Sequence, residues 1–163
     1  MSISTAQKHF NDAEDYKKKG LLQDAIESYK KAIEVDASFI SAYYNLALIY
    51  YQTQQLSQAI VNLKKVMDLD PGDVSTANNL GVLYVAMGRL NEAKRCFEKA
   101  LSIDVDYEEA RINLEKIQQK LRNAQSPSSP LQTTGINRGK KKLNVGFVSV
   151  WFERGQSYVT KIL

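Results

Sequence analysis

Apolar and small residues recur three and four positions apart along this chain, which is the spacing of one face of an α-helix. Between residues 13 and 33 the pattern comprises Ala13, Tyr16, Leu22, Ala25, Ile26, Tyr29 and Ile33. It is interrupted near Gly20, a residue type at which helices often end. The pattern therefore predicts two amphipathic helices joined by a short turn. Such a hairpin buries one face and needs a neighbour to cover it.

The same pattern returns every 34 residues. An asparagine recurs at Asn11, Asn45, Asn79 and Asn113. Further positions with this spacing are Tyr16, Tyr50 and Tyr84; Leu22, Leu56 and Leu90; Ala25, Ala59 and Ala93; Tyr29, Leu63 and Phe97; and Asp36, Asp70 and Asp104. An alanine allows two helices to approach closely, and the large residue four positions later fills the adjacent groove. The repetition predicts an all-α stack of three hairpins, with the aspartates in turns or caps rather than in acid-base catalysis.

The order of the recurring positions within each unit resembles the tetratricopeptide repeat, in which aromatic, Leu-Gly, Tyr, Ala and Pro positions follow one another. Leu80 and Gly81 match that pattern in the third unit, and Pro71 closes the second. Ala37 and Val105 replace the proline of the other units, so those turns are less firmly fixed. The resemblance implies a right-handed solenoid of three repeats, at residues 6–39, 40–73 and 74–107.

One more helix is predicted at residues 107–122, which would close a repeat domain of residues 1–123. Its inner side is apolar and carries Ala110, Leu114, Ile117 and Leu121. Its outer side is polar, which is typical of a helix that caps the end of a solenoid. Because Asn113 keeps the phase of the repeated asparagine, the same segment could equally be the first helix of an unfinished fourth repeat.

The C-terminal residues change in character. Residues 124–142 have the composition of a flexible linker. Residues 143–151 are β-branched and aromatic, as in a buried strand, and Ser157 is a candidate N-cap of a following helix. Residues 143–163 resemble the first strand and loop of two-domain nucleotide-sugar glycosyltransferases, which implies the truncated start of an α/β domain. The alternative function is therefore the acceptor-recruiting region of a glycosyltransferase whose catalytic domain lies beyond residue 163.

The charge distribution and the hydropathy of the chain limit the classes of partner that we expect it to bind. The net charge of the chain is +4, but residues 124–163 carry +5 and the remainder −1. A near-neutral repeat domain offers no electrostatic basis for binding nucleic acid. No apolar run reaches the roughly 18 residues of a membrane span, and the N-terminus lacks the features of a signal peptide. We therefore expect a cytoplasmic protein without a nucleic-acid or membrane partner.

The chain lacks the residue combinations that common catalytic and metal-binding sites require. The chain has one histidine, His9, and one cysteine, Cys96, which excludes histidine-rich and cysteine-paired metal sites. It also lacks the Gly-Lys-Ser/Thr loop that binds phosphates. We expect no enzyme activity, cofactor or metal in this chain, and we expect Cys96 to be a small buried hydrophobe rather than a reactive thiol.

The family resemblance implies a binding surface for a protein or peptide, because the first helix of each repeat lines the concave side. An amide side chain both donates and accepts, so asparagines at one repeat step match successive peptide groups of an extended ligand. The candidate peptide-binding residues are Asn11, Tyr44, Asn45, Leu48, Tyr51, Asn78, Asn79, Val82 and Asn113. An equally weighted alternative is that the asparagines form hydrogen bonds within the repeats.

Some members of this family clamp the C-terminal carboxylate of chaperones with Lys and Asn on the first helix and with Lys and Arg on the third. Phe10 and Glu14 stand at the first pair of positions, and Ser75 and Asn79 at the second. Only Asn45 of the clamp remains, so we do not expect this chain to bind chaperone tails by that route. Self-association is a third possible role, through the end repeats or through the C-terminal strand.

Overall fold

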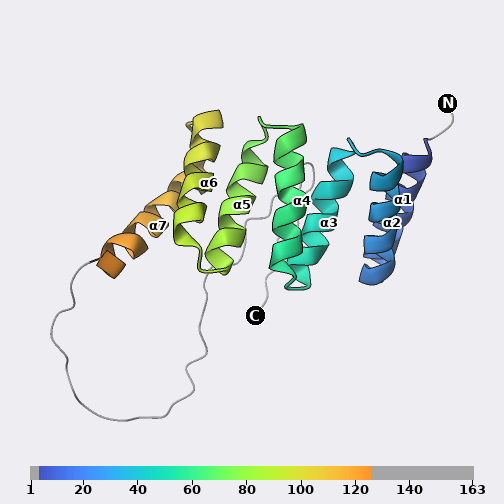
Figure 1. The fold of residues 1–163 in the computed structure, drawn as a ribbon, viewed down its shortest axis with the longest axis horizontal. Helices are drawn as coiled ribbons and strands as arrows, with labels where there is room; N and C mark the ends of the chain where they lie inside the picture. The colour runs from blue at the N-terminus through green and yellow to red at the C-terminus, as the bar shows by residue number, and fades with distance from the viewer. Residues whose placement is uncertain (1–3, 126–163) are drawn as a thin grey trace, which may run out of the picture.

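A computed structural model describes residues 4–125, which form seven helices that stand side by side in chain order (Figure 1). They are α1 (Thr5–Lys18), α2 (Leu22–Val35), α3 (Ile40–Gln52), α4 (Leu56–Leu69), α5 (Val74–Ala86), α6 (Leu90–Ile103) and α7 (Glu108–Gln125). The described part of the chain contains no strand, which confirms the all-α prediction there. Most of the predicted linker and all of the predicted α/β fragment lie outside the described residues.

Helix α7 continues past the predicted boundaries. It extends to Gln125, beyond the expected end at residue 122 and into the first two residues of the predicted linker. Residues 123–125 contain neither glycine nor proline, and the next proline is Pro127, which follows Ser126. A proline disfavours helical backbone at the residue before it, so the helix can continue until just before that pair. The helix therefore overlaps the first two residues of the predicted linker.

The turn inside each hairpin has the same geometry in all three units. Its central residue has left-handed backbone, with φ of 75° at Gly20, 61° at Gln54 and 73° at Gly88. The next backbone N–H donates to a tyrosine carbonyl five residues back: Leu21 to Tyr16 (3.0 Å), Gln55 to Tyr50 (2.7 Å) and Arg89 to Tyr84 (2.8 Å). These contacts form the Schellman motif that ends many helices. Two units meet its backbone requirement with glycine, whereas the second uses a glutamine.

The turns between hairpins are closed by the recurring aspartates. In each turn the backbone N–H two residues later donates to the aspartate side chain: Ser38 to Asp36 (2.9 Å), Gly72 to Asp70 (3.2 Å) and Asp106 to Asp104 (3.0 Å). Hydrogen bonds from Ser38 hold the pKa of Asp36 below its ordinary value. The geometry agrees with the predicted turn role, because these side chains replace backbone partners where a helix has ended.

The core follows the 34-residue period. The repeated alanines and the large residues four positions later are all buried: Ala25, Ala59, Ala93, Tyr29, Leu63 and Phe97. In the third hairpin the ring of Phe97 lies against Gly81 so closely that a Cβ there would be within 3.0 Å of three ring atoms. Gly81 therefore makes room for Phe97, whereas the second hairpin combines Ala47 with Leu63 at the corresponding positions.

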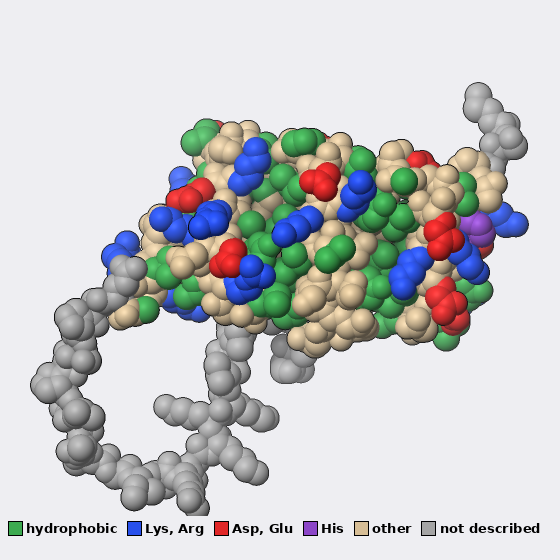
Figure 2. All heavy atoms as spheres, viewed as in Figure 1, with side chains coloured by type: hydrophobic (Ala, Val, Ile, Leu, Met, Phe, Trp, Pro, Cys, Tyr) green, Lys and Arg blue, Asp and Glu red, His purple; other side chains and the backbone are tan. Residues whose placement is uncertain are grey.

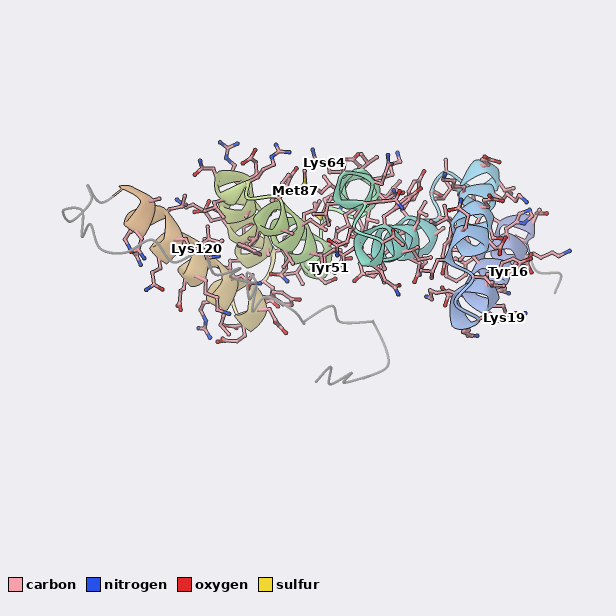
Figure 3. The ribbon with its side chains drawn as sticks, turned by 90° about the horizontal axis from the view of Figure 1, so that it is seen from below. Tyr16, Lys19, Tyr51, Lys64, Met87 and Lys120 are labelled. Carbon is pink, nitrogen blue, oxygen red and sulfur yellow. The ribbon has the colours of Figure 1, made fainter. Side chains whose placement is uncertain are left out.

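The first and second helices of the hairpins lie on opposite sides of the row of helices. In Figure 1, α2 and α4 stand in front of α1 and α3. Figure 3 turns the molecule by 90° and shows Lys64 of α4 and Tyr51 of α3 on opposite sides of the row. The front side, shown in Figure 2, intersperses basic, acidic and apolar side chains. Between residues 4 and 125, no helix combines the length and apolar character that crossing a bilayer requires.

Candidate binding face

The candidate residues lie on the first helices of the hairpins and on α7. We use the term first-helix face for the side of α1, α3, α5 and α7 that carries Asn11, Tyr44, Asn45, Leu48, Tyr51, Asn78, Asn79, Val82 and Asn113. The 34-residue period brings equivalent side chains of successive helices next to one another. Hydrogen bonds between consecutive first helices follow from this arrangement.

Three of the four repeated asparagines join neighbouring first helices. Lys17 of α1 donates to Asn45 Oδ1 of α3 at 3.0 Å. Asn79 of α5 donates to the hydroxyl of Tyr44 on α3 at 3.1 Å. The remaining link is a hydrogen bond of 3.1 Å from Asn113 of α7 to Asn78 Oδ1 of α5. The asparagines thus connect all four helices of this face through their side chains.

Two of these hydrogen bonds join residues with the same separation in the chain. Asn79 bonds to Tyr44 and Asn113 bonds to Asn78, and in each case the partner lies 35 residues earlier. The residue 35 positions before Asn45 is Phe10, which has no polar side-chain atom. Phe10 instead packs its ring against Tyr29 and Phe39, with centroid distances of 5.6 and 5.0 Å. Asn45 therefore takes its inter-helix partner from a different position on α1.

Burial separates the candidates into two groups. Asn78 and Asn79 are 2% and 3% exposed, so they lie inside the stack. Tyr44, Asn45, Leu48, Tyr51, Val82 and Asn113 are half-buried. Asn11 is exposed and accepts a hydrogen bond of 2.9 Å from Gln7 on its own helix. The alternative of hydrogen bonds within the repeats has observed contacts at Asn11 and at Asn45, whose amide donates to the Ser41 carbonyl at 2.9 Å. The peptide-binding role of the candidate residues stays a prediction.

An ion pair on α1 anchors one end of the face. Lys17 Nζ lies 2.8 Å from Glu14 Oε1, and the two side chains are 26% and 27% exposed. The buried Tyr29 hydroxyl donates to the same Glu14 oxygen. Burial, followed by this hydrogen bond to the carboxylate, raises the pKa of Tyr29. The sequence analysis did not identify this pair, although opposite charges three positions apart on one helix are a usable signal.

The centre of the face has no charge. Helices α3 and α5 contain no Asp, Glu, Lys or Arg anywhere in their sequences. Their half-buried side chains on this face include Leu48 and Val82, while Tyr51 packs against the core. At the far end, α7 carries the exposed Lys116. This side of the molecule therefore has an uncharged centre, formed by α3 and α5, between two charged ends.

Two observations outside this face concern metal binding and thiol reactivity. Residues 4–124 contain no group of three His, Cys, Asp or Glu side chains close enough to hold a metal ion. Cys96 is half-buried against the core, and burial raises its pKa to about 11. A thiol with so high a pKa is almost entirely protonated at neutral pH, which agrees with the predicted packing role.

Two family profiles match the chain. The family described as "TPR repeat" matches residues 13–54, and "Tetratricopeptide repeat" matches residues 38–104. No curated protein sequence matches the chain at a significant level. The family matches end at residue 104, and the residues predicted to resemble a glycosyltransferase lie outside the described part, so neither comparison nor structure supports that resemblance.

Solved structures share the fold. The first TPR of Spaghetti (RPAP3), bound to the HSP90 peptide SRMEEVD, is 25% identical with a TM-score of 0.64, over 72% of this chain and 93% of that one. A MamA protein is 26% identical with a TM-score of 0.65, over 74% and 67% of the two chains. The Arabidopsis OM64 TPR domain, at 19% identity, has a TM-score of 0.62 over 70% and 94%.

Proposed function

We propose that this chain, whose residues 13–104 are tetratricopeptide repeats, is a protein-interaction module that binds an extended peptide segment on its first-helix face. Similarity to the first TPR of Spaghetti, which is bound to a peptide, supports a role in protein interaction. The choice of face and the chemistry of the segment are the finer parts of the proposal, and they rest on the side chains of this chain.

The uncharged centre of the face is the observation that carries the proposal. Charged residues make up 25% of the whole chain, yet α3 and α5 have none. A water-facing helix surface normally carries charges, and the absence of charge is typical of the centre of a binding interface. We therefore propose that the central residues of the ligand are uncharged and that apolar side chains contact Leu48 and Val82.

The amides can contribute hydrogen bonds to the ligand even though they are already engaged. An asparagine side chain has two N–H donors and an oxygen with two lone pairs, and the structure uses only part of this capacity at Asn45 and Asn113. Both are half-buried and reachable from the face. We assign contact with peptide groups to these two and to Asn11, while Asn78 and Asn79 support the face from inside.

The experiment is a selection of peptides from a random display library on the full 163-residue chain, followed by affinity measurements on the selected peptides. In Leu48→Asp, a charge is placed in the uncharged centre. The matched control is Val61→Asp, which places the same charge on α4 at a side chain that is 63% exposed. Circular dichroism would establish that both variants keep the helical fold.

We expect selected peptides with uncharged central residues, and a loss of at least about tenfold in affinity for Leu48→Asp, because desolvating an unpaired carboxylate costs more than about 1.4 kcal/mol. Val61→Asp should bind as the unmodified chain does. If no peptide is enriched, or if Val61→Asp loses binding while Leu48→Asp retains it, the assignment of this face is wrong.

A further inference from the structure

The ion pair of Glu14 and Lys17 lies on the first-helix face and contacts the next repeat. Lys17 Nζ is shared between Glu14 Oε1 at 2.8 Å and Asn45 Oδ1 at 3.0 Å. Both charged side chains are about three quarters buried, so their charges act through protein rather than through bulk water alone. Any ligand that contacts Asn45 must therefore pass within a few ångströms of this pair.

We infer that Glu14 is a specificity-determining residue, which holds the Lys17 ammonium and so makes the first-helix face discriminate against acidic peptide segments. The inference rests on the proposed function of that face. A carboxylate of a ligand that approaches Lys17 meets the Glu14 carboxylate 2.8 Å from the same ammonium. Repulsion between like charges lowers the affinity for an unsuitable partner, and this contributes to specificity together with favourable contacts to the correct one.

Tyr29 fixes the position of Glu14. Its hydroxyl, from the buried core of α2, donates to the oxygen that also accepts from Lys17. A carboxylate oxygen with two donors, one of them on a buried ring, cannot swing away to admit a competing anion without leaving the tyrosine hydroxyl unpaired. The discrimination is therefore built into the packing of the first hairpin rather than into a mobile surface side chain.

The same helix contains a matched pair that should not discriminate. Asp15 and Lys18 also lie three positions apart, but their closest atoms are 3.4 Å apart and their side chains are 66% and 72% exposed. Exposed charges such as these are strongly screened by water and salt and contribute little to binding. Asp15→Asn removes the same charge from the same helix but leaves the contacts among Glu14, Lys17 and Asn45 intact.

The test measures, by NMR titration of the full chain, the affinity for the acidic peptide SRMEEVD relative to a neutral analogue. The analogue is neutral because it has glutamine for the arginine and for each glutamate, asparagine for the aspartate, an acetylated N-terminus and an amidated C-terminus. The variants are Glu14→Gln, which keeps an acceptor oxygen for Tyr29, Asp15→Asn and Lys17→Met. Circular dichroism of each variant establishes that its helical content is unchanged.

We expect Glu14→Gln to raise the ratio of acidic to neutral affinity by about fivefold, the scale of one partly exposed charge pair. Asp15→Asn should change the ratio by less than about twofold, and Lys17→Met should lower it because Glu14 is left without its cation. Lys17→Met also keeps the inference falsifiable if Glu14→Gln loses its fold.

Equal ratios for Glu14→Gln and Asp15→Asn would overturn the inference, because they would show an effect of net charge alone. An absence of detectable binding of SRMEEVD to both the unmodified chain and Glu14→Gln would overturn it as well. The proposed function fails separately, if the library-selected peptides do not depend on Leu48. Those peptides can bind normally while the acidic-to-neutral ratio stays unchanged, so the two failures are distinguishable.

Discussion

We predict that residue 81 must be glycine because the ring of Phe97 occupies the space of a Cβ there, and Gly81→Ala tests this prediction. A methyl group at residue 81 would lie within 3.0 Å of three ring atoms of a side chain that is 1% exposed. Overpacking of this kind costs about 1–3 kcal/mol, and so severe an overlap belongs at the upper end. Replacing a helical glycine by alanine contributes about 1 kcal/mol in the opposite direction. We expect a net loss of about 2 kcal/mol in the free energy of unfolding.

The second hairpin supplies the compensating change. It accommodates Ala47 beside Leu63, both fully buried, at the positions that correspond to Gly81 and Phe97. In a Phe97→Leu background, Gly81→Ala should therefore be neutral or stabilising by up to about 1 kcal/mol. The two substitutions are in direct contact, and we expect a coupling energy of about 2–3 kcal/mol between them.

The assay is urea unfolding followed by circular dichroism for the unmodified chain, both single variants and the double variant. Gly72→Ala serves as the control, because a Cβ there meets only Asp70 Oδ1 at an ordinary 3.5 Å. Its effect should stay within about 0.5 kcal/mol. The reasoning is refuted if Gly81→Ala is as stable as the unmodified chain, or if its effect is the same with Phe97 and with Leu at that position.

Two further predictions concern a turn and a thiol. Gln54 has φ of 61°, where Gly20 and Gly88 occupy the equivalent turns, so Gln54→Gly should stabilise the fold by about 1 kcal/mol in urea unfolding; a loss of stability would contradict it. Thr53→Gly, with right-handed backbone, should not stabilise. Burial raises the pKa of Cys96 to about 11, so only about one thiol in a thousand is ionised at pH 8. Labelling by Ellman's reagent should therefore be about 100-fold slower in the folded chain than in the urea-unfolded chain. Equal labelling rates would contradict the burial of this thiol.

Much of the fold could be predicted because its signals are local. Helical spacing of apolar residues depends on neighbours within one turn, and the repeated aspartates act on residues only two positions away. The periodic alanines likewise predicted where helices approach closely, and all three are fully buried. Helix α7 extends three residues beyond its predicted end, because residues 123–125 contain neither glycine nor proline.

The candidate face was only partly predictable. The 34-residue period placed the asparagines on one side, but their partners lie 35 residues earlier in two cases and 28 in the third. Which partner is reached depends on the offset between stacked helices and on the absence of a polar atom in Phe10. Residue spacing alone provides no basis for choosing between these contacts, and it does not separate the buried Asn79 from the exposed Asn11.

The sequence by itself determined the helices, their turns and the repeat step, because each of these depends on interactions within a few residues or on a period visible in the chain. Tertiary structure alone decided how the hairpins are offset, which asparagines are buried and that Glu14 shares one oxygen between Lys17 and Tyr29. These features depend on the packing of whole helices against each other, where displacement by a fraction of a helical turn exchanges one hydrogen-bond partner for another.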